Sequence, residues 1–149
     1  MLGAGDIGAQ ASWVGYIALI LLLPVVATLN AIIHGSLLKQ FLERTPAFAT
    51  YQDIVEFEKI VARQMYAALV QIALLVAPGV VFVVGLVRSV LTVNDILFVV
   101  LPSFWILAIG VAFKQVENRV RSIPVSDPIL EERRYHIVKV WLTKPIPDW

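Results

Sequence analysis

The chain contains no cysteine among its 149 residues. This absence excludes disulfides, thiol catalysis and the zinc or iron–sulfur sites that need cysteine ligands. Charge is scarce as well, because Asp, Glu, Lys and Arg make up 15% of the residues, against about 25% in an ordinary soluble domain. The formal net charge of +1 gives no broad electrostatic field that would attract nucleic acid, so no nucleic-acid partner is expected.

Catalytic motifs are also missing. The sequence has no phosphate-binding P-loop, no G-x-S-x-G nucleophile motif, no H-E-x-x-H zinc motif and no pair of carboxylates at catalytic spacing. Since so few polar residues are present, this absence indicates a protein that is not an enzyme, without a cofactor or a metal. The one candidate cofactor ligand is His34, which lies at the end of the first apolar stretch and has the chemistry of an axial ligand to haem or chlorophyll.

What the chain has in abundance is apolar residues, which make up 59% of it and give a mean hydropathy of +0.82. They are gathered in three stretches without any charged residue, between Asp6 and Lys39, between Arg63 and Arg88, and between Asp95 and Lys114. A helix needs about 20 mostly apolar residues to cross a bilayer. The sequence therefore predicts an all-α integral membrane protein with three transmembrane helices, at residues 13–34, 65–88 and 95–114.

The lysines and arginines predict the orientation of these helices. With three crossings, the first connection and the C-terminal tail lie on one side of the membrane, and that side carries every Lys and Arg except Arg88. Positive residues are enriched in cytoplasmic flanks. We therefore expect an N-out, C-in topology, with residues 1–12 as an extracytoplasmic segment, 89–94 as a short extracytoplasmic loop, and 35–64 and 115–149 in the cytoplasm.

The two cytoplasmic segments carry helix signals. Residues 36–44 continue the first helix until Thr45-Pro46, where proline ends it. Thr50 to Asp53 resembles a capping box that starts the second helix. In the tail, Ser126-Asp127-Pro128 predicts the start of an amphipathic helix over about 128–143. Its apolar residues are expected to dock on the membrane interface, on a partner subunit or on this chain's own cytoplasmic helices; the docking residues are Leu130, Ile137 and Trp141.

Polar residues and prolines inside the predicted spans are the remaining candidate features. The polar residues are neutral, and hydrogen bonds across helices are expected from Asn30, Gln71 and Ser103. Each span contains one proline that is expected to kink its helix, namely Pro24, Pro78 and Pro102. Trp105, in the middle of the third span, is expected to pack against a neighbouring helix. Pairs of small residues that permit close helix contact are Ala27/Ala31, Ala73/Ala77 and Ala108/Ala112.

These features favour a non-catalytic accessory, assembly or scaffolding subunit of a larger membrane complex, whose partners are the lipid bilayer and other membrane subunits. The alternative is a homo-oligomeric channel or transporter subunit with a pathway between protomers, lined by the three polar span residues. The absence of cysteine and of eukaryotic sorting signals favours a bacterial inner membrane, with a thylakoid or organellar membrane as the other possibility.

Overall fold

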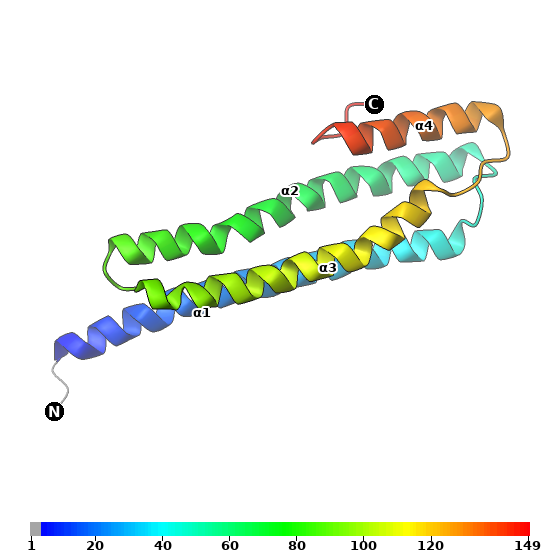
Figure 1. Ribbon diagram of the computed structural model, residues 1–149. Helices are drawn as coiled ribbons and strands as arrows, with labels where there is room; N and C mark the ends of the chain where they lie inside the picture. The colour runs from blue at the N-terminus through cyan, green and yellow to red at the C-terminus, as the bar shows by residue number, and fades with distance from the viewer. Residues whose placement is uncertain (1–3) are drawn as a thin grey trace. The chain divides into compact units, whose positions relative to one another are not determined.

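The computed structural model describes the backbone of residues 4–149 and the side chains from residue 10 onward. Within these residues the chain forms four α-helices and one short 3-10 helix (Figure 1). The α-helices are α1 (Ala4–Arg44), α2 (Tyr51–Val87), α3 (Leu97–Arg121) and α4 (Pro128–Thr143), and η1 (Val93–Ile96) precedes α3. No strand occurs in the described part of the chain, where one isolated parallel bridge joins Phe48 and Val125.

Three of the helices are long and apolar enough to cross a membrane, and they contain the three charge-free stretches. The prediction of an all-helical chain with three such helices is therefore confirmed. The helices extend beyond the expected spans. α1 begins at Ala4 and ends at Arg44, so residues 4–12 of the expected N-terminal segment are helical, and the helix also continues through residues 35–44. At about 1.5 Å per residue, the 41 residues of α1 are roughly twice what a bilayer core requires.

The chain divides into two compact units, each built from two stretches of sequence. Unit 1 contains the described residues up to Leu29 together with Gln71–Ile109. Its buried core consists of Ile17 and Ile20 of α1, Phe82 of α2 and Leu91 of the following turn, with Phe98 and Val99 of α3 packed against them. At its edge, the rings of Trp13 and Phe98 meet edge to face at 6.2 Å.

The turn between α2 and α3 is held by local hydrogen bonds. The amides of Val90 and Leu91 both donate to the carbonyl of Gly85, at 3.0 and 3.1 Å. Ser89 adopts a positive φ of 56°, which reverses the chain after α2. The carboxylate of Asp95 then accepts hydrogen bonds from the amide and the hydroxyl of Thr92, at 2.8 and 2.9 Å. The start of η1 is fixed in this way, with the acid at the third position of a capping box.

Unit 2 contains Asn30–Val70 and Gly110–Trp149. In Figure 1, α4 runs alongside the first part of α2, and the buried residues explain this placement. The core draws on all four α-helices and on the two connections, through Leu38, Phe41, Phe48, Ile54, Phe57, Val61, Met65, Val120, Ile123, Leu130, Ile137 and Val140. Burial of so many apolar side chains, at roughly 25 cal/mol per Å², is what holds α4 on its own chain.

Backbone hydrogen bonds tie the two connections of unit 2 together. The amide of Phe48 donates to the carbonyl of Pro124 at 2.9 Å, and the amide of Ser126 donates to the carbonyl of Phe48 at 3.2 Å. The side chain of Phe48 is fully buried. The α1–α2 connection and the α3–α4 connection therefore form one hydrogen-bonded layer at the end of the core.

A glycine allows α1 and α3 to approach closely in unit 2. A Cβ added to Gly35 would clash with the ring of Phe113, whose Cζ atom would be 2.6 Å away. The aromatic ring thus occupies the space that any side chain at position 35 would need. By contrast, Gly110 on the same stretch of α3 has open space around it.

Candidate functional site

Aromatic rings form the centre of unit 2. Phe57 of α2 lies between the rings of Phe48, Phe41 and Trp141, with centroid distances of 5.2, 6.0 and 6.5 Å respectively. Such offset and edge contacts add about 0.5–1.5 kcal/mol per pair beyond burial alone. The cluster therefore fixes α4 against α1 and α2 and sets the frame in which the charged side chains of this unit lie.

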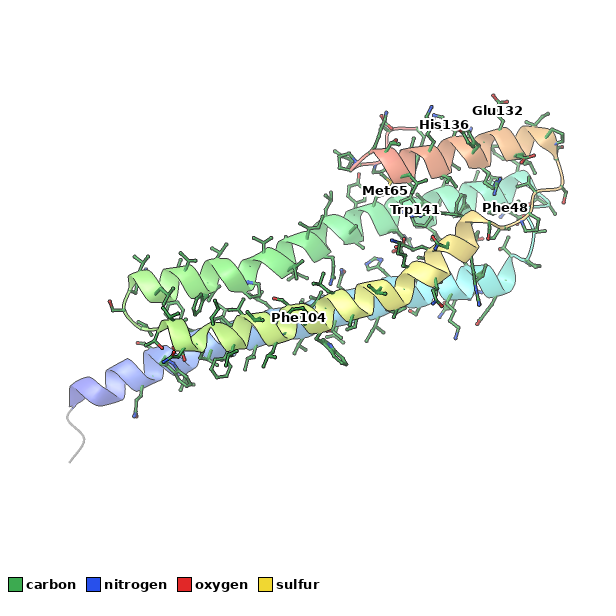
Figure 2. All side chains as sticks on the ribbon, in the orientation of Figure 1. Phe48, Met65, Phe104, Glu132, His136 and Trp141 are labelled. Carbon is green, nitrogen blue, oxygen red and sulfur yellow. The ribbon has the colours of Figure 1, made fainter. Side chains whose placement is uncertain are left out.

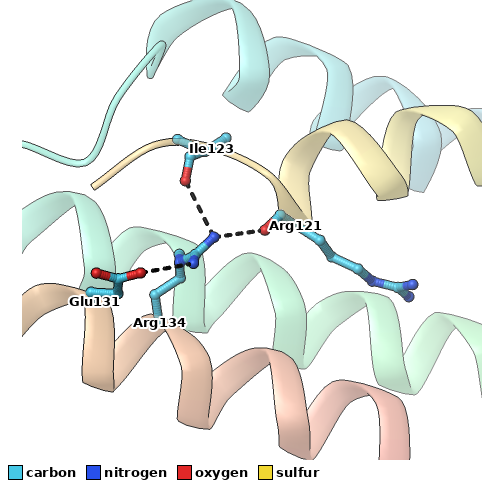
Figure 3. A network of polar contacts seen from close by, with 4 residues as sticks. All are labelled: Arg121, Ile123, Glu131 and Arg134. Carbon is cyan, nitrogen blue, oxygen red and sulfur yellow. Dashed lines mark hydrogen bonds and ion pairs between the residues drawn. The ribbon is translucent and has the colours of Figure 1, made fainter.

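Arg134 of α4 satisfies the carboxyl end of α3 (Figure 3). Its Nη1 atom donates to the carbonyls of Arg121 and Ile123, at 2.9 and 3.4 Å, and its Nη2 atom lies 3.7 Å from the carboxylate of Glu131. The last carbonyls of a helix have no partner within the helix and carry partial negative charge. The arginine therefore supplies a donor where α3 ends and links α4 to that end.

The predicted docking residues of the tail lie against this chain's own core. Leu130 and Ile137 are buried in the unit 2 core, and Trp141 packs against it. Arg133 strengthens the attachment through a 2.9 Å ion pair with Glu58 of α2. This placement corresponds to the third alternative considered for the tail, docking on the chain's own helices, because the apolar side of α4 is covered within unit 2.

The opposite side of α4 carries polar residues. Glu132 and His136 are exposed, and Figure 2 shows both on the side of the helix away from Trp141. The exposed side of α4 therefore carries charged and polar residues, together with the exposed side chains of Ile129, Tyr135 and Leu142.

The polar residues of the apolar stretches make hydrogen bonds within the chain. Asn30 of α1 donates through Nδ2 to the carbonyl of Ala67 in α2, at 3.3 Å. Ser103 differs from the expected contact across helices, because its hydroxyl donates to the carbonyl of Val99 in its own helix, at 2.7 Å. A serine inside a helix can donate its hydroxyl to the carbonyl four residues earlier and so needs no partner on a second helix. Gln71 is half-buried in α2.

The three prolines lie inside continuous helices, Pro24 in α1, Pro78 in α2 and Pro102 in α3. Pro24 is buried and Pro78 is fully buried, whereas Pro102 is half-buried. Each lacks the N–H that would bond four residues back, so the kinks expected at these positions stay a prediction.

His34 lies on α1 in unit 2. Its backbone carbonyl accepts a hydrogen bond from Nε2 of Gln64 in α2, at 2.6 Å. Its Nδ1 atom is buried and has no hydrogen-bond partner among the described side chains. Within residues 10–149 no three His, Asp or Glu side chains gather in a way that could hold a metal ion.

Sequence reasoning did not find the groove between α1 and α2 in unit 2. It has a volume of about 290 Å³ and is lined by Leu37, Gln40, Phe41, Arg44, Glu56, Lys59, Ile60, Arg63 and Gln64. The charged side chains are three cations and one carboxylate, and Phe41 forms a buried apolar base. Among the described residues, none of the three cations forms an ion pair. We call this hollow the basic groove.

A second exposed feature is the aromatic pair of α3. Phe104, labelled in Figure 2, and its neighbour Trp105 are 67% and 61% exposed. They occupy the middle of the stretch between Asp95 and Lys114 that lacks charge. Most of the Trp105 side chain is therefore left uncovered by this chain, and the expected packing against a neighbouring helix stays a prediction.

No protein family, curated protein or solved structure matches this chain. What the molecule does must therefore be inferred from its own residues and contacts.

Proposed function

We propose that the chain is a multi-pass membrane protein with its N-terminus outside and its C-terminus in the cytoplasm of a bacterial cell. The support is the distribution of charge over the two units. Unit 2 contains eleven of the twelve Lys and Arg residues, and unit 1 contains Arg88. Since lysine and arginine favour the cytoplasmic side of inserted helices, unit 2 faces the cytoplasm in this proposal.

Within that membrane, the chain acts as a non-catalytic accessory, assembly or scaffolding subunit of a larger complex. The observation that carries this proposal is the exposure of Trp105 in the middle of the charge-free stretch of α3. Tryptophan prefers the membrane interface, where its ring lies in apolar surroundings while its N–H is hydrated. An indole N–H in the hydrocarbon centre needs a hydrogen-bond acceptor, which a helix of another subunit supplies.

The alternative of a homo-oligomeric channel receives less support from the contacts. A pathway between protomers needs polar side chains that are available to line it. Asn30 donates to Ala67, and Ser103 donates to its own helix, so these two groups stabilise the protomer instead.

The experiment that tests the subunit proposal is photo-crosslinking from the membrane-embedded part of α3. Trp105 is replaced by p-benzoylphenylalanine in the full-length protein, and cells are irradiated before extraction in mild detergent. The matched control carries the same photoreactive residue at Leu107, which is 54% exposed and lies about 200° further round the helix. We expect an adduct with a different polypeptide from position 105 and none from position 107.

A complementary measurement uses Trp105→Leu, which keeps the apolar character and removes the ring. Buried tryptophans at interfaces contribute about 2 kcal/mol or more, so this variant is expected to lose its co-purifying partner while its own far-UV circular dichroism stays unchanged. Adducts with lipid alone, or a lone monomer in every mild detergent, would contradict the proposal. An adduct with a second copy of this chain would also contradict the subunit proposal and would support the homo-oligomeric alternative.

A further inference from the structure

The basic groove has the chemistry of an anion site with an apolar base. Arg44 on α1 and Lys59 and Arg63 on α2 outnumber the carboxylate of Glu56, so the groove carries an excess of two positive charges. The three cations are exposed, and none has an acidic partner within ion-pair distance among the described residues. An anion entering the groove would therefore meet cations from both helices without first displacing an internal ion pair.

The position of the groove along the helices restricts what this anion is. Arg63 is the last charged residue before the charge-free stretch of α2, and Leu37 lies just inside the charge-free stretch of α1. One end of the groove thus adjoins the apolar parts of both helices, while Arg44 and Glu56 lie towards its other end. Its occupant must tolerate cations on one side and a hydrocarbon boundary on the other.

The lining of the groove also has an apolar part beside its charged part. Phe41 is buried at the base, and Leu37 and Ile60 are half-buried beside it. The volume of about 290 Å³ is near the lower end of ligand pockets, which run from about 300 to 1,000 Å³. A headgroup with part of its glycerol fits this space, whereas whole acyl chains would remain along the apolar helices.

We propose that the basic groove binds the headgroup of an anionic phospholipid from the membrane leaflet on the side of unit 2. The phosphate pairs with Arg44, Lys59 and Arg63, and the glycerol region contacts Phe41 and its apolar neighbours. Basic pockets between membrane helices on the cytoplasmic side are suited to such headgroups. This inference depends on insertion of the helices in a bilayer and is independent of whether α3 binds another subunit.

The test measures lipid binding to the purified full-length protein in a neutral detergent by native mass spectrometry. The probes are phosphatidylglycerol, phosphatidylcholine with the same acyl chains, and inorganic phosphate. We expect a saturable phosphatidylglycerol adduct that phosphatidylcholine does not displace. A cation of the groove that contacts the lipid phosphate is expected to contribute about a fivefold gain in affinity. Arg63→Gln and Arg44→Gln are therefore each expected to weaken binding about fivefold.

Two further variants make the result specific. Lys39→Gln is the matched control, because Lys39 lies next to Gln40 on α1 but outside the groove, where it pairs with Glu43 at 3.9 Å. It is expected to leave the affinity unchanged. Glu56→Gln removes the carboxylate of the groove and is expected to raise the affinity for phosphatidylglycerol, a gain that a misfolded variant would not show.

Several results would overturn the proposal. Equal binding of phosphatidylcholine would show that the groove does not recognise the negative charge of the lipid headgroup. Inorganic phosphate that competes as well as the lipid would assign the groove to a soluble anion. A loss with Lys39→Gln as large as that with Arg63→Gln would indicate general attraction to the basic surface, and a loss of affinity with Glu56→Gln would place the lipid elsewhere.

Discussion

The guanidinium group of Arg121 lies over the indole ring of Trp141, with its central carbon 4.4 Å from the ring centroid. The same arginine pairs with Glu117 one turn earlier in α3, at 3.2 Å. The side chain of Arg121 is 23% exposed, so water screens the contact only in part. The last turn of α3 is thereby joined to the last turns of α4 through a cation and an aromatic face.

A double-mutant cycle with Arg121→Gln and Trp141→Leu measures this contact. We expect a coupling energy of about 1 kcal/mol, obtained from thermal unfolding in mild detergent followed by far-UV circular dichroism. The cycle separates this contact from the ion pair with Glu117. That pair is lost equally when Arg121→Gln is introduced into the wild-type protein and into Trp141→Leu, so it cancels from the coupling energy. The matched comparison is Arg133 with Tyr51, where the distance is 5.6 Å and the arginine side chain is 45% exposed. A coupling there as large as for Arg121 would contradict the assignment.

Gly35→Ala is expected to destabilise the protein by about 1–3 kcal/mol, because overpacking forces a shift of the ring or of the helix. The clash is with Phe113, so the smaller side chain in Phe113→Leu is expected to recover part of the loss when both changes are combined. The measurement is again thermal unfolding in detergent.

Gly110→Ala is the control for that experiment. Open space surrounds Gly110 in α3, and alanine favours a helix over glycine by about 1 kcal/mol. The variant is expected to be neutral or more stable. A cost as large as that of Gly35→Ala would show that general helix effects, rather than the contact with Phe113, decide the result.

The start of α2 is expected to depend on pH through Asp53, which lies before the apolar span of that helix. Its carboxylate accepts hydrogen bonds from the amides of Thr50 and Ala49, at 2.8 and 3.0 Å. The hydrogen bond from the Thr50 amide is the main reason why the pKa of Asp53 is lowered, although partial burial acts in the opposite direction. Because the folded-state pKa is below the unfolded value of about 4, the ionised group stabilises the helix start above that pH, and this contribution is lost as the pH falls through the lower pKa.

Acid titration of thermal stability checks this prediction. The wild-type protein is expected to lose more stability between neutral pH and pH about 3 than Asp53→Asn does. At neutral pH the asparagine variant is the less stable of the two. If the two proteins showed the same acid dependence, Asp53 would not be responsible for it.

The absence of cysteine makes the orientation directly measurable. Val93→Cys in η1 and Ile129→Cys in α4 introduce thiols at positions that are 73% and 77% exposed. A membrane-impermeant maleimide is expected to label the first variant in intact cells and the second only after permeabilisation, since the proposed topology puts the basic flank inside. Labelling of both from the same side would reject the three-crossing topology, and the unmodified chain serves as the blank.

The helices could be predicted from the sequence because the signals that determine them lie within a few residues of each helix. The charge-free stretches give the three long apolar helices. Helix starts follow from cap chemistry, as at Asp127, whose carboxylate accepts from the amide of Ile129 at 2.8 Å, with Pro128 as the first residue of α4. The end of α1 at Arg44 follows from Pro46 in the same way.

Contacts between distant segments could not be predicted, because they depend on the register of the helices. The periodicity of α4 shows that Leu130 and Ile137 share an apolar side, but it does not say which surface covers them. Spacing alone pointed to Ala108 and Ala112 as a close-contact pair, and both are exposed. The close approach instead occurs at Gly35, where the partner is an aromatic ring from a different helix.

The basic groove was missed for the same reason. Arg44 and Arg63 are unremarkable as isolated charges in a basic flank. They share one hollow because α1 and α2 run antiparallel in unit 2 and are offset so that Leu37 and Gln64 also meet there. A single sequence contains no signal that fixes this offset.

Unit 2 is assembled from residues 30–70 and 110–149, two stretches that leave the ribosome far apart in time. Phe57 and Val61 are synthesised before the residues of α4 that cover them. Until α4 has been made, an apolar surface on α2 is left uncovered, a condition that favours aggregation. A product truncated before Ile137 would lack Trp141, so its aromatic cluster would stay open.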